Sequence, residues 1–181
     1  DRAGKTVHTR HIATGEETIL PYDKLVISTG TRPVKPPVEG TDLEGVHTVS
    51  NLHHARQIKE KIASGKVEKA VVIGAGAIGI EMAEALTDLW GVETTLIEMA
   101  GQVLPYAVGE NMARVAKSHL EENDVEVLSG ETVSRINSED GRTVASVQTG
   151  NRTIECDLVV ISTGVKPNTE IAADAGLAVG R

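Results

Sequence analysis

The sequence is poor in cysteine and in aromatic residues, and each shortage excludes a class of protein. Its 181 residues contain a single cysteine, Cys156, so no disulfide framework can form and a reducing compartment is indicated. Aromatic residues make up 2% of the chain and phenylalanine is absent, so platforms for stacking single-stranded nucleic acid are missing. A net charge of -8 also opposes contact with a phosphate backbone. We therefore expect no nucleic acid partner.

Long apolar runs, a signal peptide and metal-ligand spacing are also missing. We expect no membrane partner and a cytoplasmic protein. The chain opens at Asp1 without an initiating methionine, and we interpret it as a piece of a longer protein. His53 and His54 are adjacent and cannot share a helix face, so no metal site is predicted. Cys156 has no sequence neighbour that would lower its pKa, so we interpret it as a structural thiol and expect no catalytic residue in this chain.

A glycine-rich segment in the middle of the chain follows the apolar run 70–73. Gly74 permits a tight turn, Gly76 lets a pyrophosphate approach the backbone, and Gly79 lets the next helix pack closely on the strand. Unpaired amides at the start of that helix, together with its dipole, favour a diphosphate. Four apolar residues spaced on one helical face are predicted to be buried: Ile78, Met82, Leu86 and Leu89. Gly91 is expected to end the helix.

A carboxylate follows the second apolar strand, which we place at 94–97. Glu98 stands 24 residues beyond Gly74, where a carboxylate can accept hydrogen bonds from the adenosine ribose hydroxyls. This arrangement of strand, helix, strand and acid predicts a dinucleotide site that selects NAD(H). The alternative is a glycine-rich turn in an α/β protein without a ligand, with Glu98 as a solvated strand end.

The remaining segments predict an α/β fold, a doubly wound parallel sheet with a β-meander. Before the glycine-rich segment we expect a hairpin (5–11 and 17–20, with Gly15 in the turn), a strand (23–28), an irregular interdomain linker (31–45), and a short strand near His47. A helix then follows, capped by Ser50 or Asn51, with Leu52, Ala55, Ile58 and Ile62 inward and Gly65 as its stop.

After Glu98 the pattern predicts a loop, a helix, a strand and a meander. The helix is placed at 110–122, with Met112, Val115, Ala116 and either His119 or Leu120 buried. The later elements are a strand at 125–128, three meander strands at 132–136, 143–148 and 152–155, a buried strand at 157–162 and a short helix within 168–176.

An internal near-repeat connects two of these segments. Residues 23–30 read DKLVISTG and residues 157–164 read DLVVISTG, with six identities in eight positions. Ligands of open parallel sheets bind beyond the carboxyl ends of strands, so a strand ending in Thr-Gly lets a cofactor approach the backbone. We interpret the two segments as equivalent strands that contact ligands. The alternative is two buried strands that end in ordinary glycine turns.

The order of motifs resembles one family. STGTRP, a proline-rich linker, GAGAIGIE, LIEMAGQVLP, the meander and DLVVISTGVKPN resemble the flavin-dependent pyridine nucleotide-disulfide oxidoreductases, within them the CoA-disulfide reductases and related NADH oxidases and persulfide reductases. The resemblance implies a flavoprotein with two dinucleotide-binding domains. Residues 1–34 would be the tail of the first part of its FAD-binding domain, and 35–181 its Rossmann-like NAD(H)-binding domain. A C-terminal dimerisation domain and a homodimeric parent are also implied.

The resemblance also implies cofactor contacts. NAD(H) would contact Gly74, Gly76, Ala77, Ile78, Gly79, Glu81, Glu98, Met99 and Gly164, and FAD would contact Thr29 and Gly30. Glu81 would lie near the nicotinamide, although an acid in the first turns of a helix is also favoured by the dipole alone. Many relatives carry Tyr or Phe at the position of Ala77 as a gate over the flavin, so no gating step is expected here.

The resemblance implies electron transfer from NADH through FAD to a disulfide, a CoA-disulfide or a persulfide. This chain carries no second glycine fingerprint for FAD, no CxxxxC and no N-terminal redox cysteine, so we expect it to be inactive alone. One alternative is an NADH oxidase or another flavoprotein reductase with oxygen or a metalloprotein as acceptor. The other is a free-standing NAD-binding sensor.

Overall fold

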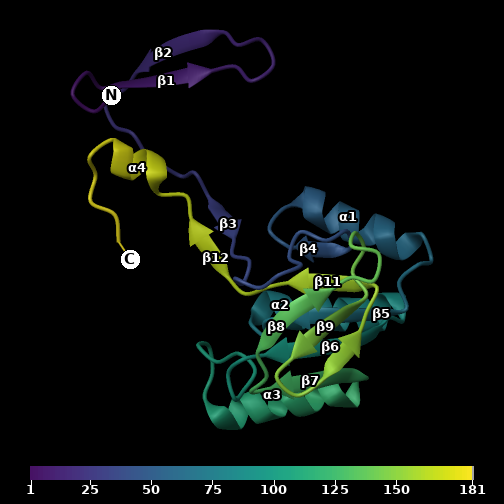
Figure 1. The fold of residues 1–181 in the computed structure, drawn as a ribbon. Coiled ribbons are helices and arrows are strands. Elements are labelled where there is room, and N and C mark those ends of the chain that lie inside the picture. Colours follow the sequence, from purple (N-terminus) through teal and green to yellow (C-terminus); the bar gives the residue numbers. More distant parts are fainter. Residues whose placement is uncertain (181) are drawn as a thin grey trace. The chain divides into compact units, whose positions relative to one another are not determined.

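The computed structural model describes residues 1–180 and divides into two compact units (Figure 1). One unit combines Asp1–Arg32 with residues 166–180, and the other is Pro33–Val165. None of the helices that the structure describes combines the length and the apolar character needed to cross a membrane.

The first unit contains the expected hairpin. Strands β1 (Thr6–Arg10) and β2 (Glu17–Pro21) pair antiparallel, and Gly15 in the turn has a φ of 74°. A left-handed conformation of this kind is open to glycine at no steric cost, which explains the residue at that position. The short helix α4 (Glu170–Asp174), predicted within 168–176, completes the unit.

The strand expected over residues 23–28 does not form. Leu25, Val26 and Ile27 are 48%, 88% and 37% exposed. No strand within residues 1–180 pairs with this segment, so its backbone gains no ladder of hydrogen bonds and its side chains no buried face. The two halves of the near-repeat are therefore not structurally equivalent, because only the second half forms a strand.

The proline-rich linker is more regular than its composition predicts. Strand β3 (Thr31–Pro33) forms a two-stranded sheet with β12 (Val165–Pro167), and both strands end on a proline. A proline is tolerated there because the strand end needs no further amide donor. Farther along, Glu39 forms a bridge with Arg135 and Glu44 forms one with Thr143, so the linker is held against the meander.

The second unit is built on a five-stranded parallel sheet. Its order is β4 (Val46–Thr48), β11 (Leu158–Ile161), β5 (Lys69–Ile73), β6 (Glu93–Glu98) and β7 (Val125–Ser129). The central strands are buried on both faces, which explains why they read as continuous apolar runs rather than as alternating patterns.

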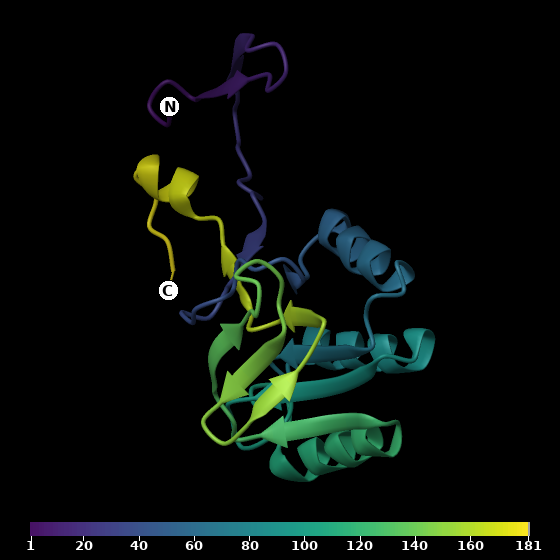
Figure 2. The same ribbon diagram turned by 45° about the vertical axis from the view of Figure 1, so that its right-hand side comes forward.

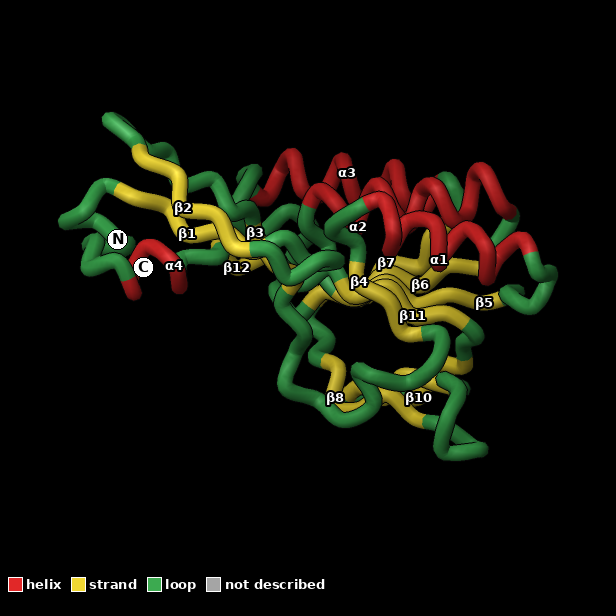
Figure 3. The backbone as a smooth tube through the Cα atoms, turned by 90° about the horizontal axis from the view of Figure 1, so that it is seen from above, coloured by secondary structure: helices red, strands yellow, loops and turns green. Residues whose placement is uncertain are grey.

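The two faces of this sheet carry different layers. Figure 3 shows the helices α1 (Leu52–Ala63), α2 (Ala77–Glu84) and α3 (Glu110–Glu122) on one face and the antiparallel meander on the other. The meander strands are β8 (Val133–Asn137), β9 (Ser146–Thr149) and β10 (Thr153–Glu155). The turned view in Figure 2 shows the same layers, so the predicted α/β fold with a meander is confirmed.

Each layer has its own apolar core, and the alternation of side chains along a strand divides β5 between them. Val72 joins the helix-side core with Leu96 and Leu120, whereas Val71 joins the meander-side core with Ile136. The side chains of Val71 and Val72 are both fully buried. The sheet therefore separates two packed volumes.

The helices begin and end where the sequence predicts, but some of them present other faces. Asn51 caps α1, accepting a hydrogen bond from the His54 amide at 3.0 Å. Ile58 and Ile62 are buried as expected, whereas Leu52 is 74% exposed and Ala55 is exposed. The first turn of α1 therefore projects beyond the core that its later turns reach.

Helix α2 is also less buried than predicted. Leu86 is buried and Met82 packs against the core, but Ile78 is 44% and Leu89 is 75% exposed. The helix continues into a single π-helical turn, η1 (Ala85–Leu89), which changes the angular spacing of side chains and turns Leu89 outward. Gly91 follows with a φ of 65° and ends the helix as expected.

Helix α3 has the predicted bounds and a different buried face. It packs through Ala113, Ala116 and Leu120, while Met112 and Val115 are 60% and 64% exposed. Small alanine side chains let the helix lie close to the sheet, and the larger residues are turned to the outside. The expected burial of Met112 and Val115 was therefore wrong, and of the two residues left open Leu120 is the buried one.

We predict that the Cys156 thiol is unreactive in the folded chain. It is 4% exposed in the meander-side core, and burial, with a smaller contribution from the charge of Asp157, raises its pKa to about 12. The thiol therefore stays protonated at mildly alkaline pH, where the reactive species is the thiolate. Titration with an aromatic disulfide reagent should detect no thiol in the native chain and one per chain in guanidinium chloride. Rapid labelling of the native chain would contradict this structural role.

Candidate functional site

The loop after β5 adopts a conformation that only glycine accommodates. Gly74 has a φ of 102°, and a Cβ at this position would lie 2.6 Å from the carbonyl oxygen of Ser162. Its amide donates to the carbonyl of Ile97 at 2.7 Å. The loop is thus fixed against β11 on one side and β6 on the other.

Gly79 allows α2 to lie directly on this loop. A Cβ on Gly79 would lie 1.9 Å from the carbonyl oxygen of Gly74, and the Ser162 hydroxyl donates to that same oxygen at 3.2 Å. Any side chain at position 79 would therefore push the helix away from the sheet. The close packing expected of the third glycine is present in the structure.

Gly76 occupies the opposite kind of environment. It is the N-cap residue of α2, and no side chain caps the helix there. No atom from another part of the chain lies within 4 Å of the place where a Cβ would stand. The first amides of a helix have no partner within the helix, and the dipole makes this end positive. The open space above Gly76 is therefore a place where an anionic group can approach the backbone.

Glu98 is buried and does not behave as a solvated strand end. It is 8% exposed, its Oε2 accepts a hydrogen bond from the Ala75 amide, and its Oε1 accepts one from the Ala100 amide, both at 2.8 Å. The carboxylate thus ties the glycine-rich loop to the loop that follows β6. Each oxygen keeps acceptor capacity for a further donor, such as a ribose hydroxyl.

These loops border a cleft of about 460 Å³ in the second unit, at the carboxyl ends of the parallel strands. Six of the residues predicted for NAD(H) line it: Gly74, Gly76, Ala77, Glu98, Met99 and Gly164. Three do not. Gly79 lies beneath the glycine loop, and Ile78 and Glu81 are exposed on α2.

The two residues predicted to contact FAD lie in the first unit and bond to one asparagine. The Thr29 hydroxyl donates to the Asn168 carbonyl at 2.6 Å, and the Asn168 side-chain amide donates back to the Thr29 carbonyl at 2.9 Å. Gly30, with a φ of 72°, accepts the Asn168 backbone amide at 2.9 Å. A flavin contact at these positions remains a prediction.

Part of the cleft wall was not found from the sequence. The loop 104–107 folds back over the glycine-rich segment, because the Leu104 amide donates to the Ala75 carbonyl at 2.8 Å. Leu104 has a φ of 50°, which is uncommon for leucine and could not be predicted from the residue type. Tyr106 is 96% exposed at the wall and could have been singled out as one of two tyrosines in the chain. The other missed residues are Pro36, Ile73, Ile97, 131–133, Ser162 and Thr163.

The cleft fits an elongated ligand with an anionic centre. Its volume lies in the range of small-molecule and cofactor sites, which is roughly 300–1,000 Å³. It combines an open helix N-terminus at Gly76 with a buried acceptor at Glu98, and apolar residues such as Ile73 and Ile97 form part of its wall. These groups match a pyrophosphate, a ribose and flat aromatic rings, so the residues present fit a dinucleotide.

The chain is similar to several curated oxidoreductases. It is 36% identical over 167 residues to an NADH oxidase of Methanocaldococcus jannaschii, covering 92% of this chain and 37% of that protein. It is 35% identical to an NAD(P)H sulfur oxidoreductase (CoA-dependent) of Pyrococcus furiosus, covering 97% and 39%. The chain thus spans well under half the length of these relatives.

Solved structures agree with this similarity. An FAD-dependent pyridine nucleotide-disulphide oxidoreductase from Desulfovibrio vulgaris matches with 46% identity and a TM-score of 0.87 over 99% of this chain and 45% of that one. An NAD-dependent persulfide reductase from A. fulgidus matches with 44% identity and a TM-score of 0.91 over 99% and 32%. The family model for pyridine nucleotide-disulphide oxidoreductases matches residues 1–181. The chain therefore belongs to the pyridine nucleotide-disulphide oxidoreductase family, which is a family of enzymes.

Proposed function

We propose that this chain is the NAD(H)-binding part of an FAD-dependent oxidoreductase. One observation carries the proposal: the open helix N-terminus at Gly76 and the buried carboxylate of Glu98 border the same cleft. The strand order places three sites in a row along the carboxyl edge of the sheet, with Glu98 at the end of β6, Gly76 after β5 and Gly164 after β11. An extended dinucleotide lies across this edge with its adenosine at Glu98 and its nicotinamide toward Gly164.

The chain's own residues bind and orient the cofactor. Amides at the start of α2 hold the pyrophosphate, Glu98 accepts hydrogen bonds from the adenosine ribose, and the absence of a side chain at Gly164 leaves room beside the nicotinamide. Bound NADH supplies the hydride that FAD receives. Cys156 takes no part because it is buried among apolar residues, so the redox-active sulfur belongs to another part of the protein.

We propose the division of the chain that the sequence indicates, with one change: residues 166–180 move from the NAD(H)-binding part to the FAD-binding part. The boundary of the compact units falls between Arg32 and Pro33, near the expected end of the FAD-binding segment at residue 34. Residues 166–180 group with that segment rather than with the NAD(H)-binding part. This grouping supports their assignment to the flavin-binding domain. We also place the parent enzyme, as a homodimer, in the cytoplasm.

The acceptor we propose is a disulfide, a CoA-disulfide or a persulfide. Support comes from 44% identity to the persulfide reductase from A. fulgidus and 34% identity to the CoADR-RHD protein of Bacillus anthracis, which matches with a TM-score of 0.90. Oxygen or a metalloprotein is the second candidate, favoured by the NADH oxidase of M. jannaschii at 36% and a probable ferredoxin reductase of Castellaniella defragrans at 35%. Membership of an enzyme family argues against a free-standing NAD-binding sensor.

The acceptor is tested with the full-length protein. We expect it to oxidise NADH faster with a CoA-type disulfide or persulfide than with oxygen, ferredoxin or rubredoxin, as followed by NADH absorbance. The chain of 181 residues should bind NADH weakly, retain no FAD and show no reductase activity, because it holds one glycine fingerprint and a buried cysteine. If the 181-residue chain were purified with bound flavin and reduced a disulfide with NADH, the assignment of flavin binding and sulfur chemistry to other parts of the protein would be wrong.

The variant Gly76→Val tests where the pyrophosphate lies. Its backbone, with a φ of -75° and a ψ of -178°, suits valine, and the surrounding space is open, so the fold should survive. The branched side chain fills the space that the pyrophosphate needs, and NADH affinity should fall by about 100-fold or more, which is roughly 2.7 kcal/mol. Circular dichroism and NADH fluorescence titration separate the two effects.

Gly79→Val is the matched control for that experiment. It places the same side chain three residues farther along, in the first turn of α2, where a Cβ would meet the carbonyl oxygen of Gly74 at 1.9 Å, so the fold itself should be lost. Undiminished NADH affinity in Gly76→Val would show that the diphosphate lies elsewhere.

The cofactor preference depends on Glu98. Its carboxylate would repel a ribose 2′-phosphate, so we expect NADH to bind at least about ten-fold tighter than NADPH, or roughly 1.4 kcal/mol. Glu98→Arg should move the preference toward NADPH. It should also weaken both cofactors, because the amides of Ala75 and Ala100 lose their acceptor. Calorimetric titrations measure both effects, and equal affinities in the unaltered chain would refute the assignment.

A further inference from the structure

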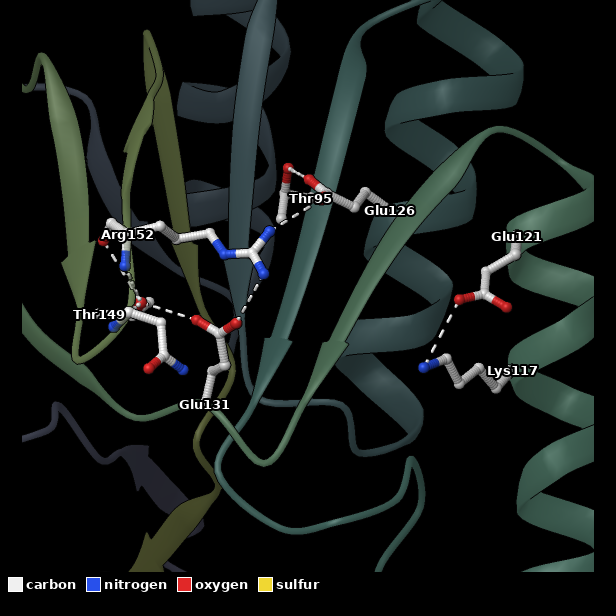
Figure 4. A network of polar contacts seen from close by, with 8 residues as sticks. Thr95, Lys117, Glu121, Glu126, Glu131, Thr149 and Arg152 are labelled. Carbon is white, nitrogen blue, oxygen red and sulfur yellow. Dashed lines mark hydrogen bonds and ion pairs between the residues drawn. The ribbon is translucent and has the colours of Figure 1, made fainter.

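A network of polar side chains joins the meander to the end of the cleft (Figure 4). At its centre is Glu131, which follows β7 and lies in the cleft wall. Its Oε1 pairs with the guanidinium of Arg152 at 3.1 Å, and its Oε2 accepts a hydrogen bond from the Thr149 hydroxyl at 2.7 Å. Both partners come from the meander, Thr149 from β9 and Arg152 from the turn before β10. Both carboxylate oxygens of Glu131 are thus held from one side.

Burial makes this carboxylate dependent on its partners. The Glu131 side chain is 9% exposed, whereas that of Arg152 is 48% exposed. A buried carboxylate is costly unless a charge of opposite sign and hydrogen bonds compensate for the lost water. Arg152 therefore supplies the charge that keeps Glu131 in the cleft wall.

Arg152 is itself oriented by a second carboxylate. Its other terminal nitrogen lies 3.5 Å from Glu126 on β7, and the second oxygen of Glu126 accepts a hydrogen bond from the Thr95 hydroxyl on β6 at 3.0 Å. The guanidinium is thus fixed between two acids, one of which is anchored to the sheet. The pair Lys117–Glu121, also drawn in Figure 4, is a surface pair on α3 outside this network.

The backbone of Glu131 connects the network to the cofactor loops. Its amide donates to the carbonyl of Glu98 at 3.1 Å, and the Gly130 amide donates to the carbonyl of Ala100 at 2.8 Å. The Glu98 carboxylate in turn holds the amides of Ala75 and Ala100. Hydrogen bonds, linked through the covalent bonds of Glu131 and Glu98, therefore connect Arg152 to the glycine-rich loop.

We propose that Glu131, held by Arg152 and Thr149, is a positioning residue for the adenosine half of the bound dinucleotide. The inference rests on the proposed function. Strand order places the pyrophosphate site after β5, the ribose acid Glu98 at the end of β6 and Glu131 after β7, so Glu131 stands at the adenosine end of the cleft. It acts through the backbone of Glu98, because the Glu131 amide donates to the Glu98 carbonyl. The Glu98 carboxylate must keep its position relative to the sheet in order to contact both the ribose and the Ala75 amide.

The variant Arg152→Met tests this role, because it removes the charge and keeps much of the side chain's length. The dissociation constants of NADH and ADP-ribose should both rise about ten-fold, since both ligands contain the adenosine ribose. The dissociation constant of reduced nicotinamide mononucleotide, which lacks adenosine, should not change. In the unliganded variant, the amides of Ala75 and Ala100 should exchange with deuterium faster by a similar factor, as measured by NMR.

Two further variants separate positioning from general stability. Lys117→Met removes a surface ion pair on another element and should change none of these quantities. Adding Glu131→Gln to Arg152→Met should restore part of the ADP-ribose affinity, because a neutral amide needs no counter-charge and still accepts from Thr149.

The outcomes are distinct. A lower melting temperature in Arg152→Met with unchanged ADP-ribose affinity and unchanged exchange at Ala75 would reduce the network to a structural one and overturn the inference. An equal loss of affinity for reduced nicotinamide mononucleotide would also overturn it, because the effect would not be confined to adenosine. If the unaltered chain binds neither NADH nor ADP-ribose, the proposed function fails, while the exchange rates at Ala75 and Ala100 still decide whether Arg152 positions these loops.

Discussion

The site depends on the bond between one buried carboxylate and one backbone amide. The Glu98 carboxylate accepts a hydrogen bond from the Ala75 amide at 2.8 Å, and this contact joins the turn after β5 to the end of β6. A charged acceptor makes such a bond stronger than one between neutral groups. The open end of α2 and the acid are therefore parts of one structure, and a substitution of the acid changes the loop at the start of α2 as well as the cleft wall.

Most elements of the second unit were readable from the sequence, because they follow from periodicity and glycine placement. The strand expected at 23–28 does not form, and β3 and β12 were not predicted. Helix α3 has the predicted ends, but the pattern favoured Met112 and Val115 over Ala113 for its buried face. The distance between a helix and a sheet decides whether large or small residues of the helix face the sheet. That distance cannot be predicted from the hydrophobicity of the residues alone. Long-range ion pairs such as Arg152–Glu131 could not be predicted from the sequence either, since they join residues from separate elements.

The near-repeat shows how strongly context governs a short segment. Residues 158–161 lie between two neighbouring strands and are buried, whereas the similar residues 23–28 have exposed apolar side chains and no partner strand within the described part of the chain. Strand propensity is a preference for a half-buried, paired surface, and it has little effect where no such surface exists. The glycine positions were more predictable, because Gly74 and Gly79 face steric limits set by their immediate surroundings.

The separation of the two cores assigns different parts of the cleft to different sets of core residues. Helix α2, whose N-terminus borders the cleft, packs into the helix-side core, while the wall residue Val133 belongs to the meander-side core. Ile73 and Ile97 also line the cleft and belong to the meander-side core, so a substitution in that core alters the apolar cleft wall, whereas the position of α2 is set by packing on the other face of the sheet.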